Sequence, residues 1–196
     1  MLNYKVQFFT LVTILLLNFG ASAEEDKYAP VRDKLQTCFV CHGENGMSKS
    51  GTFPILAGQQ FYYLYVQLKD FKSGLRQNAI MSPLVANIEK EDMKLMAEFF
   101  SEQHWTDIGY EVNAQQKAAG QKVVNSGQCV ACHLGGFNGN SRIPRLANQH
   151  VEYLNKTMLD FKNKVRNNAQ PMNSLFATFN EEEIKAVSEY LAGFKE

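Results

Sequence analysis

Apolar residues recur three or four positions apart in four segments of the 196-residue chain, 59–72, 89–102, 150–162 and 180–194. This spacing places the apolar side chains on one face of a helix, so we predict four amphipathic helices. The second and fourth segments begin with acidic residues, which suit the positive end of a helix dipole. No segment shows the two-residue alternation of a strand, and the pattern therefore predicts an all-α fold.

Two further segments, 33–41 and 115–132, are rich in helix-forming residues, and each leads into a pair of cysteines. Polar stretches that contain several glycines follow at 43–51 and 135–139. Glycines among polar residues favour turns, so these two stretches are predicted to be loops.

The same order of segments occurs twice along the chain. Residues 52–59 align with 142–149, and residues 76–79 align with 166–169. The offset between the copies is 91 residues at the cysteines, 90 through the middle and 91 again from Met172 onward. A repeat of this length is too long for one unit of a solenoid. We therefore predict two small homologous domains in tandem, related by an internal duplication.

The N-terminus has the layout of a secretory signal peptide. Lys5 precedes a mostly apolar run over 6–20, and Ala21, Ser22 and Ala23 supply the small residues of a cleavage site. The apolar run is shorter than the roughly 20 residues that a membrane-spanning helix needs. We therefore predict that the peptide is cleaved and that the protein is exported. The predicted parts of the chain are a signal peptide over 1–23, an N-terminal domain over 24–103, a linker over 104–113 and a C-terminal domain over 114–196.

All four cysteines belong to two Cys-x-x-Cys-His motifs, formed by Cys38, Cys41 and His42 and by their repeats, Cys129, Cys132 and His133. This pentapeptide is the attachment site of haem c, because two thiols bond the vinyl groups and the adjacent histidine reaches the iron. A thioredoxin-like thiol pair would lie near a βαβ pattern, which the sequence lacks. A single zinc site formed by the four cysteines would leave both histidines and the duplication unexplained. The motifs therefore predict two covalently bound haem c groups.

The second axial ligand of each iron is predicted to be a methionine. Met81 follows His42 by 39 residues, and Met172 follows His133 by the same distance. Both methionines lie in proline-containing segments that we predict to be loops. A histidine and a methionine together close the iron and raise its potential, which suits electron transfer. The other candidates lack a matching partner in the second repeat or fit core, surface or interface positions: Met47, Met93, Met96, Met158, His104 and His150.

Residues around the ligands are predicted on chemical grounds. An axial histidine needs an acceptor for its outer N–H, and a backbone carbonyl near Pro54 or Pro144 is the candidate. Two repeated tyrosines either bond the haem propionates or only pack in the core, and the sequence leaves both possibilities open. Two repeated arginines either offset propionate charge or lie at the surface, and we expect surface positions. These residues are Tyr63, Tyr153, Arg76 and Arg166.

Charge and size limit the remaining possibilities. The sequence has 20 basic and 20 acidic residues and no basic patch, so we expect no nucleic-acid partner. Each half contains only about 85 residues, which is small for an independent hydrophobic core. We therefore expect each domain to need the apolar surface of its haem in order to fold.

On these motifs the chain resembles cytochrome c4, whose members carry two class I cytochrome c domains in tandem. The resemblance rests on Cys-x-x-Cys-His, the following Pro-x-Leu-Ala-x-Gln and the late methionine, and the second half departs from the first at Asn148 and Lys164. It implies a periplasmic, mainly helical protein with a pseudo-twofold axis and haem propionates that face each other. It also implies electron transfer from a quinol-oxidising complex toward a terminal oxidase.

The expected function is that of a monomeric electron carrier without enzymatic activity, whose partners are other redox proteins. One alternative is an electron-accepting diheme subunit of a dehydrogenase, which shares the same architecture. Another is a diheme redox enzyme, such as a peroxidase or a thiosulfate dehydrogenase, which needs an open or unusual iron ligand. The sequence is compatible with peripheral association of the mature protein with the membrane.

Overall fold

The computed structural model describes residues 26–195, which form nine α-helices and two short 3-10 helices and contain no strand. The predicted all-α class is therefore confirmed. The predicted signal peptide over 1–23 lies outside the described residues. Among the described residues, no helix combines the length and the apolar character needed to cross a membrane.

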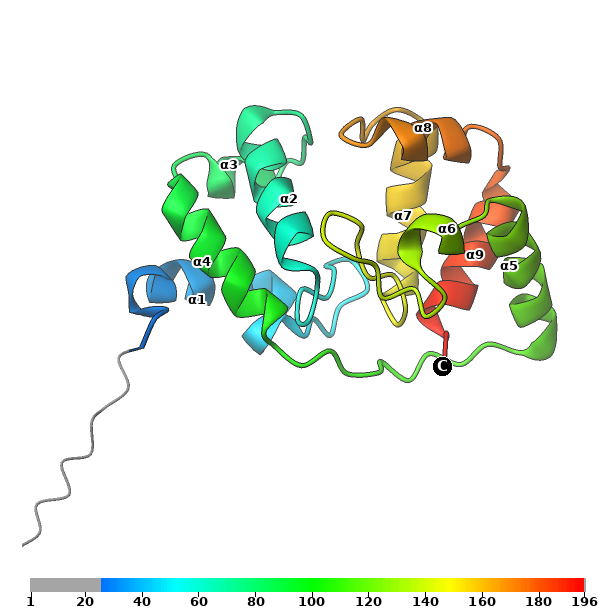
Figure 1. The fold of residues 1–196 in the computed structure, drawn as a ribbon, viewed down its shortest axis with the longest axis horizontal. Helices are drawn as coiled ribbons and strands as arrows, with labels where there is room; N and C mark the ends of the chain where they lie inside the picture. The colour runs from blue at the N-terminus through cyan, green and yellow to red at the C-terminus, as the bar shows by residue number, and fades with distance from the viewer. Residues whose placement is uncertain (1–25, 196) are drawn as a thin grey trace, which may run out of the picture.

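The N-terminal half forms one group of helices (Figure 1). Helices α2 and α4 pack against each other, and α3 packs against α2. Their apolar faces meet in a core that includes Leu64, Met96 and Phe100. The elements are η1 (Ala29–Val31), α1 (Arg32–His42), η2 (Glu44–Gly46), α2 (Phe61–Ser73), α3 (Met81–Val85) and α4 (Lys90–Ser101).

The C-terminal half forms a second group, in which α9 packs against both α5 and α7. Its core includes Val124, Leu154 and Ile184. Asn113 and Gln116 cap α5 reciprocally, and Asn180 and Glu183 do the same for α9, so the two helices begin at defined residues. The elements are α5 (Ala114–Ser126), α6 (Val130–His133), α7 (Val151–Lys162), α8 (Gln170–Phe176) and α9 (Glu181–Ala192).

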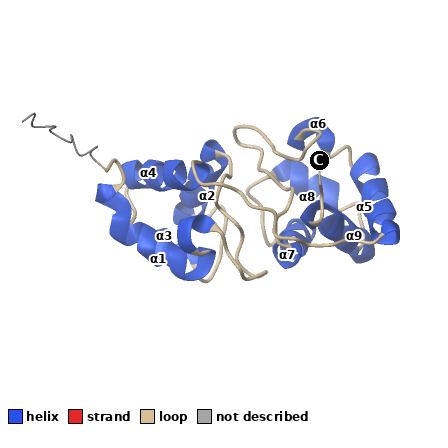
Figure 2. Cartoon of the chain, turned by 90° about the horizontal axis from the view of Figure 1, so that it is seen from below, coloured by secondary structure: helices blue, strands red, loops and turns tan. Residues whose placement is uncertain are grey.

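The two groups lie side by side, and the long loops that follow the cysteine motifs fill the space between them (Figure 2). Residues 104–113 form an extended segment that joins α4 to α5 along one edge of the molecule. Trp105 of this segment is buried against Ile55 and Ala57. The segment is therefore packed against the N-terminal half where it leaves α4.

The helix-forming residues over 115–132 belong to two helices that a turn separates. Helix α5 ends at Ser126, and the second motif lies on the separate short helix α6. Gln128 between them has φ = 50°, a left-handed conformation that cannot continue a right-handed helix. In the first half the motif lies within the single helix α1.

The prediction that Met81 and Met172 lie in loops is also wrong. Met81 is the first residue of α3, and Met172 lies in the first turn of α8. Pro83 and Pro171 occupy the first turns of the same helices. Proline is compatible with a first turn because its fixed φ is helical and its missing N–H has no partner there. The prolines therefore mark helix starts rather than irregular segments.

The two positions at which the halves differ keep the same backbone conformation. Gly58 and Asn148 have φ values of 62° and 60°, and Gly74 and Lys164 have values of 80° and 57°. Asparagine tolerates this left-handed region better than most residues. The Asn148 amide Nδ2 also donates to the Phe194 carbonyl at 2.9 Å, which holds the turn in place. Both turns are therefore retained in spite of the substitutions.

The crossing of α5 and α9 predicts a sensitive position at Gly120. A Cβ on Gly120 would lie 2.2 Å from the Tyr190 Cβ and 2.6 Å from the Ala186 carbonyl oxygen. Gly120→Val should therefore separate the helices and lower the free energy of unfolding by about 3 kcal/mol. Guanidinium chloride unfolding of the haem-loaded protein, followed by far-UV circular dichroism, measures this change.

Gly135→Ala is the matched control, because a Cβ there meets no atom within 4 Å. It should leave the unfolding midpoint nearly unchanged. Equal stability of the Gly120→Val protein and the parent would contradict the close packing of α5 on α9.

Candidate haem-binding sites

The first motif lies on the last turns of α1. Cys38 and Cys41 are three residues apart and His42 follows directly, so all three side chains share one side of the helix. The two thiols are partly buried and form no disulfide, and His42 is only 6% exposed. His133 on α6 is also 6% exposed. Each motif thus presents two thiols beside a buried imidazole.

A proline carbonyl orients each of these histidines. The Nδ1–H of His42 donates to the Pro54 carbonyl at 2.9 Å, and the Nδ1–H of His133 donates to the Pro144 carbonyl at 3.0 Å. The predicted acceptors are therefore confirmed. Because Nδ1 carries the proton, the lone pair of the neutral imidazole lies on Nε2, the atom that would bind iron.

Burial also keeps these imidazoles neutral. It lowers the pKa of His42 and of His133, and it outweighs the opposing effect of the hydrogen bond that each makes to a carbonyl. A neutral imidazole is the form that coordinates a metal. The geometry and the protonation state of both histidines therefore fit an axial ligand.

The cysteines do not have the properties of a redox-active thiol pair. Burial raises the pKa of the Cys38 thiol to about 11 and raises the pKa of Cys129 as well. Catalytic thiol pairs have a lowered pKa. Cys38 lies near the C-terminal end of α1, and the pKa of Cys129 is raised although this residue is the N-cap of α6. Among residues 26–195, no three His, Cys, Asp or Glu side chains gather into a group that could hold a metal ion.

The candidate methionine ligands are both partly buried. Met172 packs against the C-terminal core, and so does Cys129 of the second motif. Met81 begins α3, which lies against α2. The remaining candidates lie where the sequence predicted: His104 is exposed in the linker, His150 is buried and donates to the Ser48 carbonyl, and Met93, Met96 and Met158 are buried in the cores.

The repeated arginines and tyrosines meet between the two halves. Arg76 donates to the Tyr153 hydroxyl at 3.1 Å, and Arg166 donates to the Tyr63 hydroxyl at 3.2 Å. Both guanidinium groups also donate to the Gln67 side-chain oxygen, at 2.8 and 2.9 Å. The expectation that the arginines lie at the solvated surface is therefore wrong, because the duplication places each against the opposite half.

This contact carries two positive charges, and the Asp70 carboxylate is joined to it only through the Asn168 amide, at 2.7 Å. Neither Arg76 nor Arg166 forms an ion pair within residues 26–195. Burial raises the pKa of Tyr153, but the two guanidinium groups outweigh it and lower that pKa to about 7. Buried charges are costly without a counter-charge. The propionate carboxylates of haem are such counter-charges, so this contact fits the cofactor that the motifs predict.

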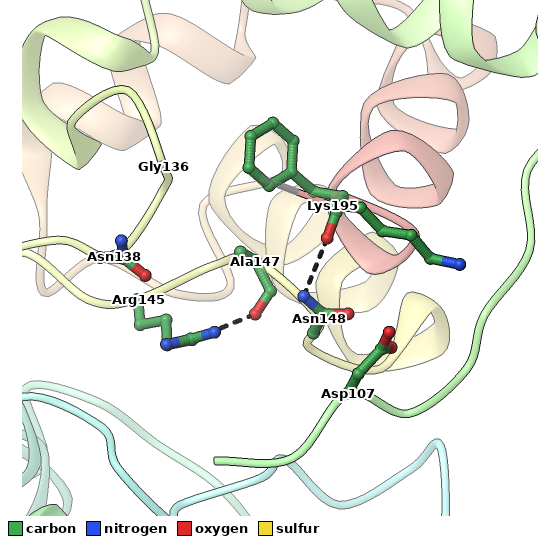
Figure 3. A pocket seen from close by; sticks show the side chains of 8 residues that line it. Asp107, Gly136, Asn138, Arg145, Ala147, Asn148 and Lys195 are labelled. Atoms are coloured by element: carbon green, nitrogen blue, oxygen red, sulfur yellow. Dashed lines mark hydrogen bonds between the residues drawn. The ribbon is translucent and has the colours of Figure 1, made fainter.

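One open cavity of about 580 Å³ lies apart from the motifs (Figure 3). The linker residue Asp107, Asn148 and the C-terminal Lys195 line it from different segments. Figure 3 shows that the Arg145 side chain donates to the Ala147 carbonyl and that the Asn148 amide donates to the Phe194 carbonyl. No predicted haem ligand or attachment cysteine lines this cavity.

Three glutamines that join the two halves were not predicted from the sequence. Gln59 and Gln149 each bond the backbone of the opposite half, and Gln67 receives both arginines. The only signal for the first two was their alignment as the last residue of Pro-x-Leu-Ala-x-Gln. Gln67 is equivalent to Thr157, so its role follows only from the three-dimensional contact.

Comparisons with known proteins agree with these observations. The cytochrome c family model matches residues 117–195. The chain is 31% identical to cytochrome c4 of Azotobacter vinelandii, over 93% of this chain and 97% of that protein. It is also 31% identical to a thiosulfate dehydrogenase electron acceptor of Stutzerimonas stutzeri, over 92% of this chain and 91% of that protein.

A solved structure gives the same result. Reduced recombinant cytochrome c4 from Pseudomonas stutzeri superposes with a TM-score of 0.77 at 29% identity, over 85% of this chain and 97% of that chain. The fold of two c-type domains and the covalent attachment of haem c follow from these matches.

The arginines predict a measurable effect on the haem potential. Arg166→Gln removes one buried positive charge and should stabilise the more positive ferric state. We expect the potential of at least one haem to fall by on the order of 50 mV. A spectroelectrochemical titration at fixed ionic strength measures this shift. Arg142→Gln is the control, because Arg142 is exposed on a loop. Equal shifts in both variants would show that Arg166 does not face the haem carboxylates.

Proposed function

Because the chain belongs to the cytochrome c4 family of electron-transferring diheme cytochromes, we propose that it carries single electrons between redox proteins of the periplasm. The proposed donor is a quinol-oxidising complex and the proposed acceptor is a terminal oxidase. A bound haem supplies a one-electron couple between ferric and ferrous iron. The observation that carries the proposal is the duplicated buried histidine, each with its outer nitrogen bonded to a proline carbonyl.

The proposed haem-binding residues follow from the repeat. Cys38 and Cys41 would attach the first haem, and His42 and Met81 would bind its iron. In the second half Cys129 and Cys132 would attach the haem, and His133 and Met172 would bind the iron. The free Nε2 of each buried imidazole and the equivalent positions of the two methionines at helix starts support this assignment.

A carrier fits this chain better than a diheme enzyme. Both halves offer the same histidine and methionine, which would close both irons to small molecules. An enzyme of this type needs at least one open or unusually ligated iron. The matching ligand sets therefore support electron transfer without turnover of a small substrate.

A second candidate function is to accept electrons from a dehydrogenase. The relative named as a thiosulfate dehydrogenase electron acceptor is as similar to this chain as the cytochrome c4 of Azotobacter vinelandii is. Rapid mixing of the oxidised protein with each donor separates the two functions. Faster reduction by a thiosulfate dehydrogenase supplied with thiosulfate than by a quinol-oxidising complex would favour the second candidate.

Export can be tested on the purified protein. We propose that the mature chain begins at Glu24, after removal of residues 1–23. N-terminal sequencing of protein isolated from the periplasmic fraction should read Glu-Glu-Asp. A chain that retains Met1 would contradict cleavage.

The methionine assignment predicts an optical signature. The oxidised protein should show a weak band near about 695 nm, which reports methionine bound to ferric iron. Met81→Ala and Met172→Ala should each remove part of this band, lower the potential of one haem by roughly 100 mV and let that haem bind carbon monoxide when reduced. Absorption spectra and a redox titration measure all three effects.

Met93→Leu is the matched control, because Met93 is buried in the core. It should keep the full band and bind no carbon monoxide. An unchanged spectrum in both alanine variants would show that the ligand assignment is wrong. Carbon monoxide binding to the reduced parent protein would favour the enzyme over the carrier.

A further inference from the structure

Each half of the chain holds the backbone of the other through one glutamine. The Gln149 side chain accepts from the Ile55 N–H at 2.9 Å and donates to the Ile55 carbonyl at 3.0 Å. Gln59 makes the same pair of bonds to Arg145, at 2.8 and 3.0 Å. The two pairs are related by the duplication, so the contact is reciprocal.

The bonded residues directly follow the prolines that orient the motif histidines. The carbonyl of Pro54 and the N–H of Ile55 belong to one peptide group, which is planar and rigid. The carbonyl end of this group accepts from the His42 Nδ1–H, and the N–H end donates to Gln149. A single peptide group therefore separates the histidine of one half from the glutamine of the other.

The second half repeats this arrangement. The peptide group between Pro144 and Arg145 accepts from the His133 Nδ1–H at its carbonyl end and donates to Gln59 at its N–H end. Hydrogen bonds in a chain polarise one another, so a bond at the N–H end strengthens acceptance at the carbonyl end. The glutamine thus acts on the histidine electronically as well as sterically.

Burial keeps water from replacing these bonds. Gln59 and Gln149 are 4% and 3% exposed, and Ile55 is 1% exposed. Each glutamine oxygen also accepts the N–H of the next residue in its own chain segment, which fixes the side-chain conformation. Trp105 of the segment 104–113 packs on Ile55, and the Arg145 guanidinium lies 4.7 Å from the centroid of the Trp105 ring. Trp105 therefore contacts both residues whose backbone the glutamines bond.

We propose that Gln59 and Gln149 are reciprocal positioning residues, each of which sets the strength of the axial histidine in the opposite domain. The inference rests on the proposed ligation by His42 and His133. A stronger bond from the outer N–H makes an imidazole a more basic ligand, which favours ferric iron. The contact between the domains therefore holds both potentials below the values that freely oriented histidines would give.

The test uses full-length, haem-loaded protein with Gln149→Leu or Gln59→Leu, which keep the side-chain volume and remove the bonds. Gln149→Leu should raise the potential of the haem attached beside His42 and leave the other haem unchanged. Gln59→Leu should raise only the potential of the haem beside His133. A redox titration followed by NMR separates the two haems, because the haem methyl signals are assigned through contacts with each domain.

A second measurement reports the histidines directly. Exchange of the His42 Nδ1–H with solvent should become about tenfold faster in Gln149→Leu and stay unchanged in Gln59→Leu. If a leucine variant fails to bind haem, the alanine variant at the same position is measured instead.

Gln60→Ala is the matched control. It removes the bond from Gln60 to the Asn138 carbonyl, which also joins the two halves but does not involve the peptide group of a histidine acceptor. Equal shifts in Gln60→Ala and Gln59→Leu would overturn the inference, because general loosening of the interface would then explain both. The inference would also be overturned if the potential changed for the haem in the same domain as the substituted glutamine, or if neither potential changed.

The outcome is distinguishable from failure of the proposed function. A parent spectrum without two histidine-ligated haems would refute the ligand assignment itself. A parent with both haems intact, combined with unaltered potentials in the two glutamine variants, would refute only the reciprocal role of Gln59 and Gln149.

Discussion

The hydrogen bond from each buried motif histidine to a proline carbonyl is the constraint on which the rest of the structure depends. A buried imidazole must satisfy its outer nitrogen, and a carbonyl does so while leaving Nε2 available. The bond requires the loop after each motif to return across the histidine, which places Pro54 and Pro144 beside His42 and His133. Because these loops pass between the two groups of helices, the same requirement brings the halves into contact (Figure 2).

That contact is polar and nearly symmetric, and it follows from the duplication. Gln60 donates to the Asn138 carbonyl in the loop after the second motif, and its equivalent His150 donates to the Ser48 carbonyl in the loop after the first motif. The change from an amide to an imidazole therefore preserves a donor at the same place. Between the two halves, the guanidinium groups of Arg76 and Arg166 share one acceptor, the Gln67 side-chain oxygen. Haem carboxylates would supply the counter-charge that these buried groups need, and cofactor binding would then stabilise the contact between the domains.

Small domains of this kind depend on more than their own apolar residues. Each half has few helices and a modest core, and the crossing of α5 on α9 is so close that Gly120 leaves no room for a side chain. A covalently held haem adds apolar surface that the chain cannot lose. Attachment through two cysteines would also fix the haem relative to the protein.

The sequence by itself determined the helical class, the duplication, the haem attachment motifs and the acceptors near Pro54 and Pro144. These features depend on local spacing, since a helical period, a pentapeptide and a neighbouring carbonyl are encoded by nearby residues. Local patterns were misleading at two places. Prolines suggested loops where they occupy the first turns of helices, and the left-handed Gln128 interrupts a stretch whose neighbours favour a helix. Only the tertiary structure decided the burial of Arg166 and the hydrogen bonds of Gln59 and Gln149, because these contacts join residues 86 to 103 positions apart. Their partners are set by how the two halves pack, and no local pattern records that packing.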